Sequence, residues 1–421
     1  MNDSKKSSQV SGFYKMPIKK RVEFVKKYAN LTNEEEKLFS SCLDLETADR
    51  MIENVLGTFE LPLGIAVNFK INGKDYLVPM TIEESSVVAA ASNAAKIARI
   101  QGGFTTECTD PLMIGQMQVV KIDDVAKAAQ SIMNHKKELL ELANAQDKIL
   151  VKFGGGAKDL EVRILDSPLG KMIVAHIIVD VRDAMGANAV NTMCEALAPM
   201  VEELTGGKVR LKILSNLADK RIVKAKAVFD KEKMGGEKIV DAFIQSYILA
   251  SIDPYRAATH NKGIMNGIDS VIIATGNDFR AIEAGAHAYA SRNGQYTSLS
   301  TYYKDKNGNL VGELEIPMAV GIVGGAGNIH PKARLCKKIL GIKTAQELAE
   351  IVASVGLAQN FAAVFALSTV GIQKGHMSLH AKNIAVMAGA SGDLIEKIAN
   401  QLIKEGNIKL DRAKEIFNEI K

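Results

Sequence analysis

The sequence predicts a mixed protein of the α+β or α/β class, in which a small domain is inserted into a larger one and helices end the chain. Residues 111–219 predict the order β-α-β-β-α-β, which is that of a ferredoxin-like or split βαβ module. The flanking segments, 1–110 and 220–375, mix helices, a hairpin and glycine-rich loops, and we expect them to form one larger α/β domain. Residues 376–421 predict two or three helices with a Gly-Ala-Ser-Gly hinge after the first.

The composition is that of a soluble globular protein whose cores are built from aliphatic side chains. Of the 421 residues, 47% are hydrophobic and 24% are charged, which excludes a disordered chain, and tryptophan is absent. The net charge of +5 is too small for this length to indicate nucleic-acid binding. The four cysteines lie far apart, so neither a disulfide framework nor a structural zinc site is expected. The polar N-terminus and the lack of an apolar run of roughly 18 residues predict a cytoplasmic protein that does not enter a membrane.

The larger domain is expected to contain one hairpin and several helices. Residues 64–80 predict a β-hairpin with an Asn-Gly pair at its turn. Residues 87–100 have a helical composition, and Ser86 is a natural N-cap for that helix. The glycine-rich stretch 260–269 is expected to be a loop in which the backbone comes close to a ligand. The apolar run 270–276 is expected to be a strand that leads into a helix.

The inserted domain carries the sharpest local pattern. Residues 124–146 predict one long amphipathic helix, and residues 187–205 predict a second helix. The strand 172–181 precedes the second helix, and Gly186 allows the tight passage between them. The free N–H groups of such a helix N-terminus suit a pyrophosphate, although an ordinary strand–turn–helix connection has the same pattern. The motifs GxGxxG and GxxxxGK[ST] do not occur, which disfavours a Rossmann domain and a P-loop NTPase.

Several ionisable residues stand where catalytic groups could lie, and each also has an ordinary structural explanation. Glu84 lies at a strand-to-helix junction. Lys262 would usually be solvated, but beside acids in a closed site it could stabilise an oxyanion. Asp278 precedes a helix and would most often be an N-cap. His376 and His380 could share a metal ion, but no third ligand is apparent, and either could be a core or capping histidine or a single proton donor.

The densest charge in the chain is basic. Between Lys15 and Lys27 the sequence has six cations and one acid. Such a run fits a solvated helix face, and it also fits the binding of a phosphate-rich ligand. The residues alone leave both explanations open.

Eight segments carry motifs that occur together in one enzyme family. They include ENVLG, DAMGAN and HNKGIMNG, which are specific as a set. The segments are residues 53–62, 83–92, 183–193, 210–219, 253–269, 274–290, 356–363 and 371–386. In this order, and over nearly the whole chain, they resemble the class II 3-hydroxy-3-methylglutaryl-coenzyme A (HMG-CoA) reductases of bacteria and archaea.

The resemblance implies a separate function for each domain. Residues 1–110 and 220–375 would bind HMG-CoA, residues 111–219 would bind the nicotinamide cofactor, and residues 376–421 would form a flap. The implied reaction is the four-electron interconversion of HMG-CoA with mevalonate and coenzyme A, through mevaldyl-CoA and mevaldehyde, with two NAD(P)H and no metal. The implied assembly is a homodimer that shares its active sites and forms hexamers. The alternative is a protein that binds CoA or a nucleotide on this scaffold without catalysis.

The resemblance also assigns roles to individual residues. The implied catalytic residues are Glu84, Lys262, Asp278 and His376. The implied substrate contacts are Lys15, which would meet coenzyme A, and Ser86, Arg256, Thr259, Asn266, Gln359 and Asn360. The implied cofactor contacts are Asp147, Asp183, Met185, Gly186, Ala187, Asn188 and Asn216. Asp147 matches a carboxylate of NADH-using members, and because a carboxylate accepts from a ribose 2′-hydroxyl but repels a 2′-phosphate, we expect NADH to be preferred over NADPH.

Overall fold

The computed structural model describes residues 6–369 and 372–420, without the side chains of residue 326 and of residues 372–379. Up to the end of the smaller sheet the elements are η1 (Phe13–Lys15), α1 (Ile18–Ala29), α2 (Asn33–Lys37), η2 (Leu38–Ser40), α3 (Leu45–Asp49), β1 (Leu63–Ile71), β2 (Lys74–Thr81), α4 (Val87–Ala98), η3 (Arg99–Gln101), β3 (Phe104–Cys108), β4 (Leu112–Val120), α5 (Val125–Asn134), α6 (Lys136–Asn144), α7 (Lys148–Lys152), β5 (Gly156–Leu165), β6 (Met172–Asp180), α8 (Ala187–Thr205) and β7 (Lys208–Ser215). They continue with β8 (Ile222–Phe229), α9 (Lys231–Met234), α10 (Glu237–Ile252), α11 (Pro254–Ala274), α12 (Phe279–Ala290), β9 (Ser300–Lys304), β10 (Leu310–Pro317), α13 (Ala326–Ile329), α14 (Pro331–Leu340), α15 (Ala345–Ser368), α16 (Ile372–Met387), α17 (Asp393–Glu405) and α18 (Leu410–Ile420).

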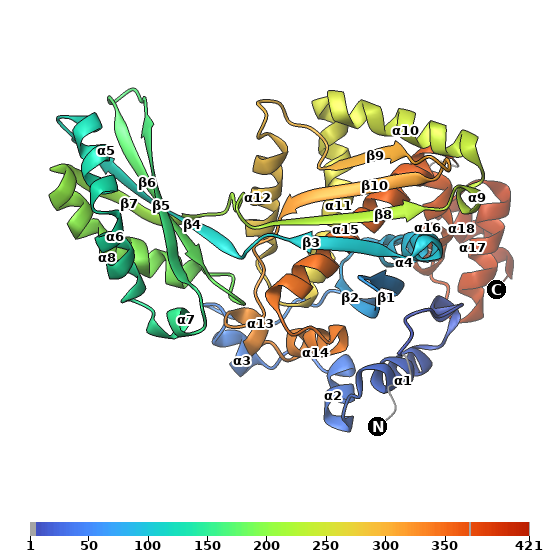
Figure 1. The fold of residues 1–421 in the computed structure, drawn as a ribbon. Helices are drawn as coiled ribbons and strands as arrows, with labels where there is room; N and C mark the ends of the chain where they lie inside the picture. The colour runs from blue at the N-terminus through green and yellow to red at the C-terminus, as the bar shows by residue number, and fades with distance from the viewer. Residues whose placement is uncertain (1–5, 370–371, 421) are drawn as a thin grey trace.

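The larger sheet has six strands in the order β2-β1-β3-β8-β10-β9, and α4 and α15 pack against it (Figure 1). The predicted hairpin is confirmed, because β1 and β2 pair antiparallel around a turn at Asn72 and Gly73, both at positive φ. In β8 the side chains alternate, with Ala225 and Ala227 buried and the lysines between and beside them exposed. The Phe361 ring of α15 stacks on Phe229 of β8, with ring centroids 3.7 Å apart, so the core lies between that helix and the sheet.

The smaller sheet has four antiparallel strands in the order β5-β6-β4-β7, with helices α5, α6 and α8 packed against it. The chain order β4-α-β5-β6-α8-β7 is the predicted β-α-β-β-α-β, and it confirms the ferredoxin-like class. Figure 1 shows this sheet and its helices beside the larger sheet, joined to it through β4 and β7. The single helix predicted over 124–146 is interrupted, since His135 leaves the helical region at φ −101° and separates α5 from α6.

Helix α11 runs through two segments for which the sequence predicted a loop and a strand. The loop expected at 260–269 and the strand expected at 270–276 are both wrong, because one continuous helix runs through them. A short apolar run cannot be assigned by periodicity alone, and here the run is a buried helical segment. The glycines serve the packing of α11 on α15: a Cβ added at Gly267 would lie 2.8 Å from the carbonyl oxygen of Val355.

The last three helices form a cluster of their own, with buried side chains such as Ala381, Leu402 and Ile416. The predicted helices are confirmed, and α16 ends before a turn in which Gly389 and Gly392 have positive φ, at the place predicted for the hinge. These helices lie at the edge of the molecule away from the small sheet (Figure 1). The expectation that the chain has no apolar run of roughly 18 residues is wrong for α15, which among the described residues is the one helix long and apolar enough to cross a bilayer. Most of the apolar window of α15 is buried inside this fold.

Candidate active site

An ion pair between two segments far apart in the sequence forms the centre of the site. Glu84 lies in the turn between β2 and α4, and Lys262 lies in the middle of α11. The Lys262 Nζ is 2.8 Å from Glu84 Oε2, and the Asn266 Nδ2 is 3.4 Å from the same oxygen. The side chains of Lys262 and Glu84 are 60% and 38% exposed, so a ligand can reach both. The sequence candidates Glu84, Lys262 and Asn266 therefore meet at one accessible place.

Two further candidates extend this centre along α11. Arg256 and Thr259 precede Lys262 by six and three residues, and Asn266 follows it by four, which puts the four side chains on one face of the helix. We call Arg256, Thr259, Lys262 and Asn266 the α11 stripe. Arg256 is partly buried, and this burial lowers the pKa of its guanidinium below the usual range. A row of donors that leads to a carboxylate suits a substrate rich in oxygen atoms.

Ser86 stands at the N-cap position of α4, as predicted, but it does not cap the helix with its side chain. Its backbone has φ 73° and its hydroxyl makes no capping hydrogen bond. A non-glycine residue in the left-handed region is strained, and such strain is concentrated at functional sites. The hydroxyl is thus left for another partner next to Glu84.

The two polar candidates of α15 lie in different environments. Asn360 is fully buried, with its Oδ1 accepting from Ser300 and Tyr302 and its Nδ2 donating to the carbonyl of His260, so it ties α15 to α11 and β9. Gln359 packs against Gly267, and its Oε1 is buried without a hydrogen-bond partner among the described residues. A buried acceptor without a partner is rare in a folded protein, so Gln359 is the better ligand contact of the two.

Asp278 is not brought to Lys262 within one chain. It caps α12, with Oδ1 accepting from the backbone of Arg280 and Ala281, and its Oδ2 pairs with the Arg280 side chain at 3.0 Å. Lys262 lies 12 residues before the end of α11, which is about 18 Å of helix, and Asp278 follows that end. The N-cap explanation from the sequence is confirmed. If Asp278 acts beside Lys262, as the catalytic role implied by the resemblance would require, it must be the Asp278 of another copy.

His376 lies in α16, but its side chain is outside the described residues. Lys15 is exposed, and its Nζ lies 5.8 Å from the ring centroid of Tyr14.

The predicted cofactor residues lie where the smaller sheet meets the larger part of the fold. Gly186 has φ 104° and precedes α8, whose first turn receives no side-chain cap. A Cβ at Gly186 would lie 2.6 Å from Val181, so only glycine fits this passage. Met185, Ala187 and Asn188 flank it. Asp183 already has a structural partner, since its Oδ1 accepts a hydrogen bond from the N–H of Ala345 at the start of α15.

Asn216 and Asp147 complete this region. A Cβ at Gly285 of α12 would lie 2.5 Å from the carbonyl oxygen of Asn216, so the residues after β7 lie against α12. Asp147 caps α7 by accepting from Leu150 N–H. The Arg182 side chain donates to the carbonyl of Gly154, which holds the α7 loop at the end of β6 where the chain turns towards α8. A nucleotide on the α8 N-terminus would therefore meet a free helix end, a tight glycine passage and a nearby carboxylate.

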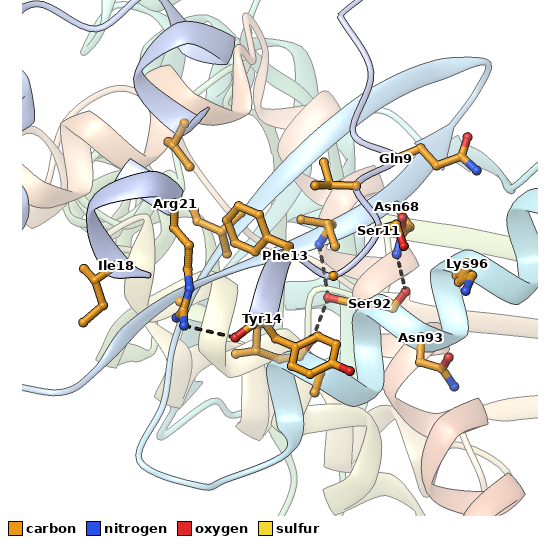
Figure 2. Close-up of a pocket in the computed structure, with 18 of the residues that line it drawn as sticks. Gln9, Ser11, Phe13, Tyr14, Ile18, Arg21, Asn68, Ser92, Asn93 and Lys96 are labelled. Carbon is orange, nitrogen blue, oxygen red and sulfur yellow. Dashed lines mark hydrogen bonds between the residues drawn. The ribbon is translucent and has the colours of Figure 1, made fainter. Parts of the chain in front are cut away.

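A cavity of about 860 Å³ lies along α4, and sequence reasoning missed most of the residues that line it. Its walls are residues 9–14, helix α1, strand β1 and the outer face of α4 from Val88 to Lys96. Figure 2 shows Arg21 on one side of this pocket and Asn93 and Lys96 on the other. We call it the α4 groove. The walls of this groove come from three separate segments of the chain, so no single motif predicts it. Only the basic stretch between Lys15 and Lys27 indicated a ligand site in this region.

Comparison with known proteins identifies the family. The sequence model described as hydroxymethylglutaryl-coenzyme A reductase matches residues 17–381. The 3-hydroxy-3-methylglutaryl-coenzyme A reductase of Archaeoglobus fulgidus is 57% identical over 416 residues, which are 99% of this chain and 95% of that protein. A structure of the reductase from Streptococcus pneumoniae is 43% identical, with a TM-score of 0.84 and coverage of 98% of this chain and 99% of that one. A class II reductase from Streptococcus pneumoniae, bound to NADPH in open conformations, is 43% identical, with a TM-score of 0.81 and coverage of 96% and 100%. The chain belongs to the HMG-CoA reductase family, and within that family to class II.

Proposed function

We propose that this chain catalyses the interconversion of HMG-CoA with mevalonate and coenzyme A, using two molecules of reduced nicotinamide cofactor. The observation that carries the proposal is the accessible centre of Lys262, Glu84 and Asn266. It combines a cation, a carboxyl group and an amide donor around one place where a carbonyl oxygen can be held. The family to which the chain belongs supports this reaction.

In the first reduction the thioester carbonyl becomes a tetrahedral hemithioacetal, mevaldyl-CoA, and its oxygen gains negative charge. Lys262 stabilises this oxyanion, because a fixed ammonium lowers the energy of charge that develops in the transition state. The hemithioacetal then collapses to mevaldehyde and the thiolate of coenzyme A. His376 protonates the thiolate, a role that suits an imidazole near neutral pH. In the second reduction Glu84, in its protonated form, donates to the aldehyde oxygen.

The substrate also requires contacts away from the reacting carbon. Ser86, Arg256, Thr259, Asn266 and Gln359 bind the HMG moiety, while Asn360 supports them from the core.

The α4 groove begins two residues after Ser86 and follows α4 from Val88 to Lys96, which is about 12 Å. The pantetheine arm lies in this groove, with the coenzyme phosphates near Lys15, Arg21 and Lys96.

The cofactor binds at residues 111–219, on Asp183, Met185, Gly186, Ala187, Asn188 and Asn216. Bound there, the reduced nicotinamide supplies one hydride in each of the two reductions. The α8 N-terminus holds the pyrophosphate, and Asp147 receives the ribose hydroxyl. The catalytic chemistry needs no metal.

The working enzyme is a cytoplasmic homodimer that assembles further into hexamers, with residues 1–110 and 220–375 as the HMG-CoA-binding domain and residues 376–421 as a mobile flap. The distance along α11 between Lys262 and Asp278 supports a site that two subunits share. Leu56 and Phe59, which are 99% and 91% exposed in the ENVLG region, also support a subunit interface, because apolar side chains so exposed need a cover.

The test of the function is the absorbance at 340 nm with HMG-CoA and either NADH or NADPH. Consumption of roughly two reduced cofactors per HMG-CoA is the expected result for a four-electron reduction. If folded protein oxidises neither cofactor, the catalytic proposal is wrong and a CoA-binding protein without activity takes its place.

The cofactor assay also tests Asp147. We expect the intact chain to prefer NADH, and we expect Asp147→Asn to lower the ratio of kcat/KM for NADH to that for NADPH about tenfold, because the repulsion of the 2′-phosphate is removed while an acceptor remains. Asp159→Asn is the control, since Asp159 is another carboxylate of the same domain, paired with Lys136. If the intact chain prefers NADPH, the proposed reductase activity stands, but the proposed role of Asp147 is wrong.

His376→Ala should separate the two halves of the reaction. Reduction of HMG-CoA should fall about 10²–10⁴-fold, the range of a lost general acid, because the thiolate leaves unprotonated. Reduction of added mevaldehyde, which has no thiolate to release, should stay near the rate of the intact enzyme. His380→Ala is the control from the same helix. An equal loss in both reactions would refute thiolate protonation by His376.

A further inference from the structure

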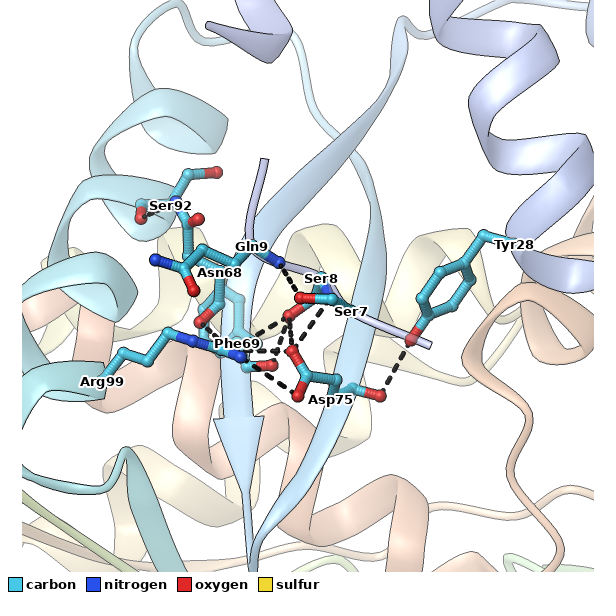
Figure 3. Close-up of polar contacts among 9 residues, drawn as sticks. All are labelled: Ser7, Ser8, Gln9, Tyr28, Asn68, Phe69, Asp75, Ser92 and Arg99. Atoms are coloured by element: carbon cyan, nitrogen blue, oxygen red, sulfur yellow. Dashed lines mark hydrogen bonds and ion pairs between the residues drawn. The ribbon is translucent and has the colours of Figure 1, made fainter. Parts of the chain in front are cut away.

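Ser8 is completely buried although its neighbours Ser7 and Gln9 are exposed. Its Oγ lies 2.8 Å from the carbonyl oxygen of Phe69 and 2.7 Å from Asp75 Oδ1, and its N–H donates to that same carboxylate oxygen at 2.9 Å. Its own carbonyl accepts from the N–H of Asn68 at 2.8 Å. The backbone and the side chain of one serine therefore attach the N-terminal segment to the β1–β2 hairpin (Figure 3).

The carboxylate that receives Ser8 is held by Arg99, which lies just after α4. Arg99 approaches both oxygens of Asp75, with Nη1 at 2.7 Å from Oδ1 and Nη2 at 3.1 Å from Oδ2, and both side chains are more than four-fifths buried. Burial raises the pKa of Asp75, but the hydrogen bonds from Arg99 and Ser8 outweigh it and leave the pKa below the usual range. Asp75 is thus ionised at neutral pH. We call Ser8, Asp75 and Arg99 the N-terminal clasp.

The clasp continues directly into the lining of the α4 groove. The β1 strand bulges between Ala66 and Phe69, and Asn68 there has φ 72°. The Asn68 Nδ2 donates to the carbonyl of Ser92 in α4, and the N–H of Val67 donates to the Ser92 hydroxyl. Asn68 and Ser92 both line the groove, and the N-terminal lining begins at Gln9, the residue after Ser8. Three walls of the cavity are therefore tied together at one point.

Helix α1 is attached to the same point, since the Tyr28 hydroxyl donates to the backbone carbonyl of Asp75 at 2.8 Å. Burial, with a smaller effect of Asp75, raises the pKa of Tyr28 to about 12, so the tyrosine stays a neutral donor. Because α1 carries Arg21, the clasp also fixes the side of the groove that holds Arg21. Arg21 in turn donates to the carbonyls of Met16 and Tyr14, which holds the turn that closes the N-terminal wall.

We propose that the N-terminal clasp positions the wall of the α4 groove and thereby sets the affinity of the enzyme for the coenzyme A part of its substrate. This inference rests on the proposed function, in which the groove holds the pantetheine arm. Ser8, Asp75 and Arg99 are positioning residues: none of them lies at the Lys262–Glu84 centre, and they act through the segment that covers the groove. Loss of the clasp frees that segment, so the substrate has to order it again on binding.

The test uses Ser8→Ala in the full chain, with Ser7→Ala as the matched control. Ser7 is the exposed neighbour, and among the described residues its hydroxyl accepts only from the N–H of Gln9. In Ser8→Ala the KM for HMG-CoA should rise about tenfold, the effect of losing one hydrogen bond to a charged group. The kcat at saturation, the KM for the nicotinamide cofactor and the reduction of free mevaldehyde should stay unchanged. Ser7→Ala should match the intact enzyme in all four quantities.

A second variant, Arg99→Lys, keeps the charge but loses the two-pronged contact, and it should give a smaller rise in the same KM. A fall of kcat and of mevaldehyde reduction in Ser8→Ala would overturn the proposal, as would a lower thermal stability with an unchanged KM.

Calorimetric binding of free coenzyme A separates this proposal from the proposed function. If the intact chain binds coenzyme A but does not oxidise NAD(P)H, the proposed reaction fails while weaker binding by Ser8→Ala still supports the clasp. If both chains bind coenzyme A equally, the clasp proposal is wrong whatever the activity.

Discussion

Alanine in place of Lys262 should lower kcat for HMG-CoA reduction about 10²–10³-fold, which corresponds to about 2.7–4 kcal/mol of transition-state stabilisation. The Lys262 ammonium lies 2.8 Å from Glu84 and is open to the space where the substrate carbonyl would lie. No other cation of the α11 stripe is so close to Glu84, since Arg256 lies almost two turns away. The loss should appear in kcat, because the negative oxygen exists only in the transition state and the intermediate. Initial rates at 340 nm with saturating HMG-CoA measure it.

Lys224→Ala is the control for this prediction. Lys224 also forms an accessible ion pair with a glutamate, Glu315, at 3.2 Å, but it lies on the outer face of the larger sheet. Its loss should leave kcat unchanged, because exposed ion pairs contribute little to stability. A Lys262→Ala variant with normal kcat and a raised KM for HMG-CoA would mean that Lys262 binds the ground state and is not an oxyanion donor.

If Asp278 of one subunit acts on Lys262 of the other, mixing the inactive variants Lys262→Ala and Asp278→Ala should restore activity. Lys262→Ala and Asp278→Ala should each have less than about a hundredth of the intact kcat, because each removes one charged group of the same centre. After unfolding and refolding together in equal amounts, about half of the symmetric dimers contain one subunit of each kind. Each mixed dimer then has one site with Lys262 from one subunit and Asp278 from the other, both intact. The mixture should regain about a quarter of the intact activity.

The control is the same experiment with Lys262→Ala and Glu84→Ala. These two residues meet within one chain, so no mixed dimer has a complete centre and no activity should return. If the mixture of Lys262→Ala and Asp278→Ala also stays inactive although mixed dimers form, Asp278 does not act across the interface. Separation of differently tagged subunits measures how many mixed dimers form.

The elements that the sequence predicted correctly are those with local signals. The Asn-Gly turn at 72–73 fixed the hairpin, because few other residue pairs adopt positive φ twice in succession. Helix α8 begins after Gly186 and runs over the predicted 187–205, because the glycine and the 3.6-residue pattern mark both its start and its buried face. The β-α-β-β-α-β order of the small domain was predicted because each of its elements has a local signal of this kind.

The errors arose where tertiary packing decides the local structure. Gly263 and Gly267 suggested a loop, but both lie in α11 facing α15, and Gly267 makes room for that helix. The apolar run after them suggested a strand, but it is enclosed by other elements and is helical. A helix buried in this way has a weak amphipathic pattern. A glycine in it can be required by the close packing of a neighbouring helix and need not indicate a turn of its own backbone.

The site was predicted in part. The resemblance named Glu84, Lys262 and Asn266, and the structure brings these side chains together from segments about 180 residues apart. Their roles in the reaction stay a prediction. The N-terminal clasp gave no signal, since Ser8 and Asp75 are separated by 67 residues and neither stands in a recognisable motif. No rule of spacing or propensity relates two residues that only the folded chain makes neighbours.

The contact of Gly267 with α15 has a consequence for how this enzyme can vary. Lys262 and Asn266 reach Glu84 from a helix whose distance from the core is set where Gly267 meets Val355, backbone against backbone. A larger residue at position 267 would push against the Val355 carbonyl and shift the whole row of donors outward, although it would touch no substrate. A change at position 267 can therefore alter the catalytic rate from inside the core, without any contact of its own to the substrate.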